Sequence, residues 1–398
     1  MGVDVRALDP AEYRAAQDVF MAALMRPPTT DEQWRVREGT IRQGDVLGGF
    51  HDGTLAGTTR LFGSTLRVPG GAAVPAGAVT AVGVRADKTR RGVLTALMRA
   101  QLTDAKNRGH VVAMLHASEA AIYGRFGYGA ATRARQVRLT IASVKWRDDM
   151  PRGGAVRLVD RADAEKLLPE LYRRIGTARP GMMERSDGWW RVGFSRHEQR
   201  SLYGYAVHSD EHGDDDGYAL YHAVPLGGDD IKLQVHDLVA ATSTAAAELW
   251  RFLTGIDLAT EIEAARPVDE PLEWWLQDAR QCRTVDVFDD LWVRLVDVPA
   301  ALHARTFGGS TPVVIEVRDR ILPQNDGVYR IGSDGAERSE RSPQLVMDVE
   351  SLGALYLGDV SVSTVAAANR VEVRDPAALE DADAVFTTPR QPWCGTHF

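Results

Sequence analysis

The chain has little cysteine and no long apolar stretch. Only Cys282 and Cys394 occur among its 398 residues, so neither a disulfide framework nor a cysteine metal cluster can form. The first ten residues hold no apolar run of signal-peptide length, and nowhere do about 20 apolar residues follow one another. We therefore expect a cytoplasmic protein without a membrane span.

Lysine is also scarce, and the overall charge is negative. Five of the 47 basic residues are lysines, and 55 acidic residues bring the net charge to −8. A protein that binds nucleic acid in general needs clustered positive charge to neutralise phosphates. We expect no nucleic-acid partner, and we interpret the negative charge as favouring a cationic small molecule.

The length predicts more than one domain, because compact domains average roughly 150 residues. We assign residues 1–140 to a first, mixed α/β unit. Its signals are a helix from Tyr13 to Leu24, two strands joined by the hairpin dipeptide Asp52-Gly53, a strand Val79–Val84 and a helix Val93–Arg108. A strand Val111–Leu115 and a short helix end the pattern.

Two further units follow. Residues 141–284 partly repeat the order of the first unit, with strands on either side of an acidic turn at 210–216 and a helix from Ser243 to Leu253. Residues 285–398 change to short strands mixed with short helices, which predicts a third unit of α+β class. We place the strands Val285–Phe288 and Leu291–Val298 in this third unit.

One loop of the first unit has the composition of an anion site. The strand segment Val82-Gly83-Val84 leads into Arg90-Arg91-Gly92, which opens the helix Val93–Arg108. Backbone N–H groups at a helix start attract anions, and glycine lets a phosphate approach the backbone closely. A pyrophosphate would fit this loop. The alternative is a solvated basic turn before an ordinary helix.

A second motif supports the interpretation of this loop as a cofactor site. It begins with His116-Ala117-Ser118-Glu119 and continues as Ile122-Tyr123-Gly124-Arg125-Phe126-Gly127-Tyr128. It resembles the stretch of the GNAT acetyltransferases in which a tyrosine lies one turn before a Gly-Phe or Gly-Tyr pair. The basic loop is similar to the cofactor motif of the same enzymes, although Thr89 and Leu94 depart from the residue types usual there.

Over its whole length the chain resembles the Eis-like N-acetyltransferases. The resemblance rests on R-R-G-V-L-T-A-L-M, L-H-A-S-E, I-Y-G-R-F-G-Y, the strand Leu291–Val298 and the terminal P-W-C-G-T-H-F. It implies an active GNAT domain, a degenerate GNAT-like domain and a sterol-carrier-protein-like domain, assembled as a homohexamer. It also implies acetyl-CoA as co-substrate.

The resemblance assigns two catalytic residues. Tyr123 would protonate the departing CoA thiolate, which a phenol with a pKa near about 10 can do. The terminal carboxylate of Phe398 would accept the proton of the substrate amine, with burial raising its low intrinsic pKa. The alternatives are a packed aromatic side chain at Tyr123 and an apolar tail that only packs at Phe398.

Further residues follow from the motifs and the resemblance. The CoA-binding residues are expected to be Val82, Gly83, Val84, Arg90, Arg91, Gly92, Val93, Leu94, Thr95 and Ser118. The substrate pocket is expected to include Trp34, His116, Glu119 and His397. For His116 a purely structural role at the end of a strand remains open.

The second unit lacks the corresponding loop. Its strand with Val235-His236-Asp237 runs into the helix without arginine or glycine at the turn, so we expect no CoA binding there. The neighbouring pairs of histidine and aspartate are typical of surface turns, and we expect no metal site.

The sequence thus predicts direct acetyl transfer from acetyl-CoA to a primary amine within a ternary complex. Aminoglycosides, as polyamines, are the favoured acceptors. In the family such acceptors meet acidic residues, whereas this chain has Leu24 and His397 at two of those places. The alternatives are acetylation of protein lysines and, in another class, lipid carriage by the third unit.

Overall fold

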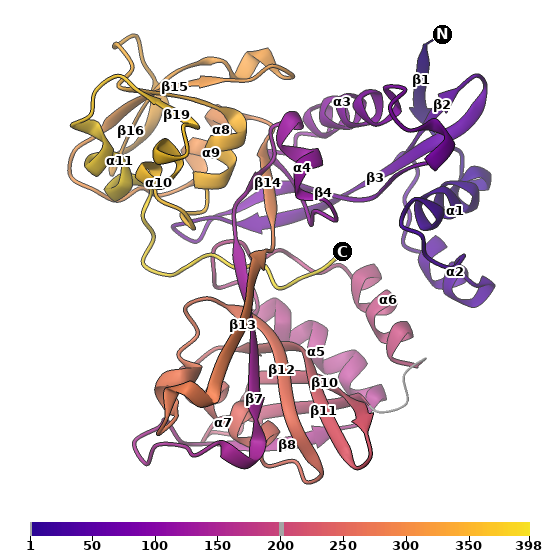
Figure 1. Cartoon of the computed structure of the whole chain (residues 1–398), viewed down its shortest axis with the longest axis vertical. Helices are drawn as coiled ribbons and strands as arrows, with labels where there is room; N and C mark the ends of the chain where they lie inside the picture. The colour runs from indigo at the N-terminus through magenta and orange to yellow at the C-terminus, as the bar shows by residue number, and fades with distance from the viewer. Residues whose placement is uncertain (1, 199–202) are drawn as a thin grey trace.

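The structure is a computed structural model that describes residues 2–198 and 203–398, and it contains three β-sheets (Figure 1). Two sheets have seven strands and the third has five. In Figure 1 the first unit lies at the upper right, the third at the upper left and the second below them. Among the described residues, no helix combines the length and the apolar character that crossing a membrane requires.

The first sheet contains the predicted hairpin and the predicted strand, loop and helix. Asp52 and Gly53 have positive φ angles of 53° and 72°, as a two-residue hairpin turn requires. Helix α3 (Val93–Asn107) packs on one face, and α1 (Tyr13–Ala23) packs on the other face beside Gly83. The strand order is β1 (Val3–Ala7), β2 (Val46–His51), β3 (Thr54–Arg67), β4 (Ala73–Val84), β5 (Val112–Leu115), β14 (Trp292–Leu295) and β6 (Gly129–Ala130).

The second sheet repeats much of this arrangement. Helix α7 (Ser243–Thr254) confirms the helix predicted from Ser243 to Leu253, and the unit also contains α5 (Arg161–Ile175) and α6 (Asp187–Glu198). The strand order is β13 (Cys282–Asp289), β7 (Arg133–Thr140), β12 (Ala259–Pro267), β11 (Asp230–Ala240), β10 (Asp215–Gly227), β9 (Tyr203–Ser209) and β8 (Ala155–Val159).

The third sheet packs against four short helices and buries large aromatic side chains between them. Tyr329, Tyr356 and Phe386 are at most 1% exposed there. The hydroxyl of Tyr356 donates to the carbonyl of Ala301, at 2.8 Å. The strands are β17 (Gly335–Arg338), β16 (Gly327–Gly332), β15 (Val313–Arg318), β18 (Leu345–Asp348) and β19 (Val371–Val373), and the helices are α8 (Val298–Ala304), α9 (Val349–Leu355), α10 (Val362–Ala367) and α11 (Ala378–Phe386).

Three strands lie in other sheets than the sequence predicted. β13, expected in the third unit, pairs with β7 at the edge of the second sheet. β14, also expected in the third unit, enters the first sheet between β5 and β6. β7 itself was assigned to the first unit. Pairing partners so distant in sequence leave no local pattern, so β13 and β14 could be predicted as strands but not assigned to their sheets.

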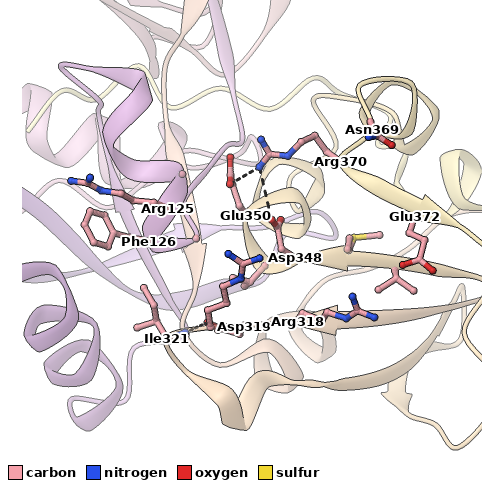
Figure 2. A pocket seen from close by; sticks show the side chains of 16 residues that line it. Arg125, Phe126, Arg318, Asp319, Ile321, Asp348, Glu350, Asn369, Arg370 and Glu372 are labelled. Atoms are coloured by element: carbon pink, nitrogen blue, oxygen red, sulfur yellow. Dashed lines mark hydrogen bonds and ion pairs between the residues drawn. The ribbon is translucent and has the colours of Figure 1, made fainter. Parts of the chain in front are cut away.

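The first and third units meet at a pocket that Arg125 and Phe126 of the first unit line together with residues of the third, among them Asp319 and Glu350 (Figure 2). Arg294 of β14 is fully buried, and it binds both the carboxylate of Asp319, at 2.7 Å, and the carbonyl of Phe126, at 2.8 Å. A Cβ atom on Gly124 would lie 2.7 Å from the carboxylate of Glu350. That glycine of the tyrosine motif therefore serves the contact between units.

Candidate active site

Strands β4 and β5 part in the middle of the first sheet. They pair in parallel only from Ala76 to Ala78, while β4 continues to Val84. A bulge with Ala81 at φ 51° shifts the pairing of β4 with β3 just beyond this point. β4 therefore has an open edge on the side of β5.

The backbone of that open edge can bind an extended ligand. The N–H of Arg85 donates to the carbonyl of Ala56 in β3, so strand alternation turns the N–H groups of Val84 and Val82 the other way. Gly83 also has a packing role. A Cβ atom there would lie 3.0 Å from Ala23 and Phe20, so this glycine lets α1 pack closely.

The N-terminus of α3 is open to an anion. Gly92 has a φ of 84°, a left-handed conformation that favours glycine, and within the described residues no side chain caps the helix. The N–H groups of Val93, Leu94 and Thr95 are thus left for a ligand, with exposed Arg90 and Arg91 preceding them. These features fit a phosphate group of CoA. The side chain of Val93 is buried, so only its backbone can take part.

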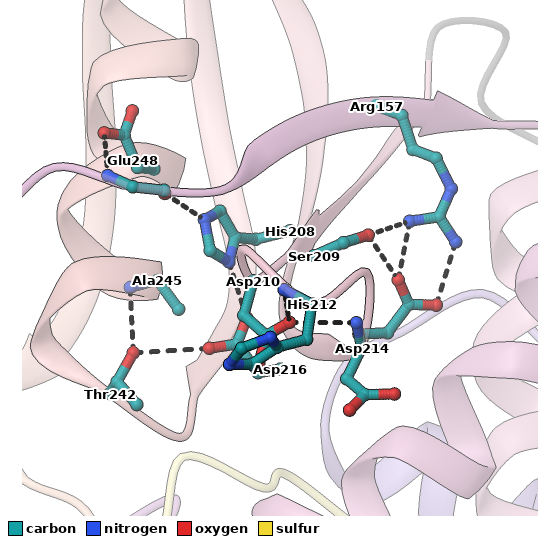
Figure 3. Close-up of polar contacts among 12 residues, drawn as sticks. Arg157, His208, Ser209, Asp210, His212, Asp214, Asp216, Thr242, Ala245 and Glu248 are labelled. Atoms are coloured by element: carbon teal, nitrogen blue, oxygen red, sulfur yellow. Dashed lines mark hydrogen bonds and ion pairs between the residues drawn. The ribbon is translucent and has the colours of Figure 1, made fainter.

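The corresponding helix of the second unit is closed (Figure 3). The Thr242 hydroxyl oxygen accepts from the N–H of Ala245 at 3.0 Å and donates to Asp216 at 3.3 Å. His208 uses both ring nitrogens in this region, on Asp216 and on the carbonyl of Gly153. A helix start that its own side chain satisfies has less to offer a phosphate.

Tyr123 ends the short helix α4 (Ala120–Tyr123) and is 6% exposed. It belongs to a buried cluster that Val82 and Leu94 also contact, so the phenol lies near the open edge and the start of α3. Burial, assisted by the charge of Glu119, raises the pKa of Tyr123 to about 12. The phenol is therefore protonated at neutral pH, as a proton donor must be. Ser118 and Glu119 are exposed at the start of α4.

The last eight residues, 391–398, form a C-terminal tail that crosses from the third unit to the space between the first and the second (Figure 1). Trp189 Nε1 donates to the carbonyl of His397 at 2.7 Å, and His116 Nε2 donates to that of Thr396 at 2.8 Å. The ring of Phe398 meets those of Phe62 and His116 edge-on, with centroids 5.7 and 5.0 Å apart. The terminus is docked.

A buried carboxylate organises the tail. Asp290, 2% exposed, accepts from the backbone N–H groups of Cys394, at 2.9 Å, and Gly395, at 3.3 Å. Its other oxygen lies 3.6 Å from Nδ1 of His116. One ring nitrogen of His116 thus binds the tail, and the other faces Asp290, which also holds the tail. This favours a positioning role for His116 over direct contact with substrate.

The second unit also holds the tail, through a residue that the sequence did not reveal. Arg185 donates to the hydroxyl of Thr396 at 3.0 Å and pairs with Asp237, which lies on the strand of the degenerate loop. Three aromatic rings, of Tyr172, Trp189 and Trp190, surround its guanidinium. An isolated arginine followed by tryptophans carries no recognisable motif.

A cavity of about 580 Å³ opens beside the tail. Phe398, His397, Phe62 and Trp189 line it, so the terminal residue and its expected neighbour His397 lie together. Trp34 does not line it. Its indole packs against the apolar cluster of Leu8 and Tyr13, while Arg37 of the same helix, α2 (Asp31–Glu38), faces the cavity. In the described part of the chain the terminal carboxylate makes no ion pair.

The chain matches three family models. Acetyltransferase (GNAT) domain models match residues 4–131 and 181–295, and a sterol carrier protein domain model matches residues 298–395. These matches confirm the expected succession of two GNAT-like domains and a sterol-carrier-like domain. The protein is therefore an acetyltransferase enzyme of the GNAT fold, a class that uses acetyl-CoA.

Several relatives match nearly the whole chain. An uncharacterized N-acetyltransferase of Streptomyces avermitilis is 37% identical over 425 residues, covering 100% of this chain and 99% of that protein. N-acetyltransferase Eis of Mycobacterium tuberculosis is 33% identical over 373 residues, covering 91% and 90%. The crystal structure of Eis1 from Mycobacterium abscessus superposes with a TM-score of 0.91 at 37% identity, with 100% of both chains covered. The chain belongs to the Eis N-acetyltransferase family.

Proposed function

We propose that this enzyme transfers an acetyl group directly to a primary amine within a ternary complex, using Phe398 and Tyr123. When bound, acetyl-CoA supplies an acetyl carbon that bonds to the amine nitrogen as its bond to sulfur breaks. The Phe398 carboxylate accepts the proton that the nitrogen gives up. The Tyr123 hydroxyl donates a proton to the sulfur. The proposed chemistry calls for no metal ion.

The docked terminus is the observation that carries this proposal. Hydrogen bonds from Trp189 and His116 hold the two carbonyls before Phe398, and Asp290 holds the two N–H groups before those. A terminus that only packed would need no such set of polar contacts on consecutive residues. For Tyr123, the raised pKa of about 12 supports the role of acid.

The proposed acetyl-CoA site comprises the open edge of β4 at Val82 and Val84 and the start of α3 from Gly92 to Thr95. Aminoglycosides remain candidate acceptors because the chain ends in a carboxylate beside the cavity. The homohexamer stays a prediction, which analytical ultracentrifugation can test.

Incubation with acetyl-CoA and a panel of amines tests the function. The panel holds an aminoglycoside, a lysine-containing peptide and simple alkylamines. We expect mass spectrometry to detect acetylated product and a thiol reagent to detect released CoA in equal amounts. Thiol release without amine acetylation, or no reaction with any amine, would refute amine transfer.

A further inference from the structure

The cavity beside Phe398 carries a surplus of positive charge. Six arginines line it, namely Arg37, Arg42, Arg60, Arg108, Arg191 and Arg196. Against them stand two aspartates, Asp45 and Asp187, and the terminal carboxylate. Asp45 is already engaged, because its carboxylate lies 3.3 Å from Arg108 and 3.9 Å from Arg60. In a chain with a net charge of −8, this local charge is opposite to the overall one.

One of these guanidinium groups lacks an anion, and a second, Arg60, has only the distant contact with Asp45 at 3.9 Å. Within the described residues the side chain of Arg37 makes no ion pair and no hydrogen bond, although it is half-buried. Burial and the like charges of Arg196 and Arg60 lower the pKa of Arg37 to about 10. Arg60 reaches the carbonyl of Thr40, but its Nε is buried without a hydrogen-bond partner. Such an arrangement is unfavourable unless a negative group enters it.

The positive groups continue from the ring of Phe398, the residue that carries the proposed catalytic carboxylate. The ring of Phe398 meets the ring of Phe62 at 5.7 Å, and the guanidinium of Arg60 lies 5.5 Å from the same Phe62 ring. Arg37 follows, near enough to Arg60 to respond to its charge. One small molecule can therefore reach both the carboxylate of Phe398 and the arginines. The cavity volume of about 580 Å³ is in the range of small-molecule binding sites.

We propose that the acceptor carries an anionic group, a carboxylate or a phosphate, in addition to its primary amine. The inference rests on the proposed function, because it places the amine at the Phe398 carboxylate. Arg37 and Arg60 then bind the anionic group, since the planar guanidinium matches both oxyanions and can bind them through two hydrogen bonds. A polycation would meet like charge at this end of the cavity.

Amines that differ only in the far end of the molecule test the proposal. The probes are ε-aminocaproate, aminohexyl phosphate, hexylamine and hexamethylenediamine, whose far ends are a carboxylate, a phosphate, a methyl group and a second amine. We expect kcat/KM for the better anionic probe to be at least about tenfold higher than kcat/KM for hexylamine. The difference from the diamine should be larger still. The ranking of the two anionic probes identifies the oxyanion.

A pair of variants on helix α2 links the preference to the cavity. Arg37→Gln removes one guanidinium from the lining, and we expect the ratio of kcat/KM between the anionic probe and hexylamine to fall about tenfold. Arg35→Gln is the matched control, because Arg35 is exposed on the same helix and does not line the cavity. It should keep the ratio of the unaltered enzyme.

The outcomes separate this inference from the proposed function. Acetylation of hexylamine or the diamine as efficiently as the anionic probes would overturn the anionic acceptor and leave amine transfer standing. If neither these probes nor any amine of the panel above is acetylated, the proposed function fails, and calorimetry of ε-aminocaproate and inorganic phosphate decides the anion site. Calorimetric binding that is weakened in Arg37→Gln and unchanged in Arg35→Gln supports the anion site. If neither ligand binds, the anion site is overturned.

Discussion

The Asp290→Asn substitution measures how firmly the C-terminal tail is docked. The side chain keeps its shape, and its remaining oxygen can still accept from the N–H groups of Cys394 and Gly395. It loses the negative charge. A hydrogen bond to a charged group contributes about 1.5–3 kcal/mol and a neutral one about 1 kcal/mol, so the two tail bonds together weaken by about 1–4 kcal/mol.

That change in free energy shifts the equilibrium between the docked and the open tail. Because about 1.4 kcal/mol corresponds to a factor of ten, the equilibrium constant for docking should fall roughly 5- to 700-fold. Hydrogen exchange reads this constant directly, since the amides of the tail exchange when it opens. We expect the protection of residues 391–398 to fall by the same factor. The value of kcat should also fall, with an unchanged Kd for acetyl-CoA.

Asp359→Asn is the control for this experiment. Asp359 is also a buried carboxylate, but it pairs with Arg133 at 2.6 Å rather than with the tail. Its substitution should leave the exchange of the tail unchanged. If Asp290→Asn exchanged its tail amides no faster than the unaltered chain, the assigned role of Asp290 would be wrong.

Three further predictions concern the donor side of the site. Tyr123→Phe should lower kcat at least about 100-fold while calorimetry finds acetyl-CoA bound as before. Because the pKa of Tyr123 is raised to about 12, its proton stays on as pH rises, and kcat should not decline between about pH 8 and 10. An alkaline decline in that range that disappears in Tyr123→Phe would contradict this. Gly92→Ala strains a residue at φ 84° and should weaken acetyl-CoA binding several-fold, whereas Gly53→Ala, at φ 72° in the hairpin, should not; equal Kd values would refute the role of Gly92.

Local sequence patterns predicted the local structure of the donor side. The helical period of Val93–Arg108, the turn at Asp52-Gly53 and the Arg90-Arg91-Gly92 loop each reflect interactions between residues close in sequence. All three appear in the structure as expected. The roles assigned to Val82 and Leu94 are consistent with their position beside Tyr123.

The acceptor side could not be predicted in the same way. Arg37 and Arg191 come from helices far apart in sequence, and only the folded chain brings them to one cavity. Arg185 and Asp237 likewise acquire their role through the docked tail. The negative net charge suggested a cationic acceptor, but a site responds to the charges that line it rather than to the sum over the chain.

These contacts give the second unit a structural role. Its helix α7 is capped by Thr242, which differs from the open start of α3. Its strand β11 instead carries Asp237, which holds Arg185 and through it Thr396 of the tail. A unit that has lost the cofactor loop thus supports the terminus of the chain beside the first unit.

The position of the terminal carboxylate is the central claim, and one extension of the chain tests it most directly. Appending a single alanine after Phe398 keeps the aromatic ring but turns its carboxylate into a peptide carbonyl. Phe398→Leu is the control, because it keeps an apolar side chain and the carboxylate in place. We predict that the extended chain loses at least about 100-fold in kcat, with an unchanged Kd for acetyl-CoA, and that the leucine variant keeps most activity. An extended chain with full kcat would contradict the account.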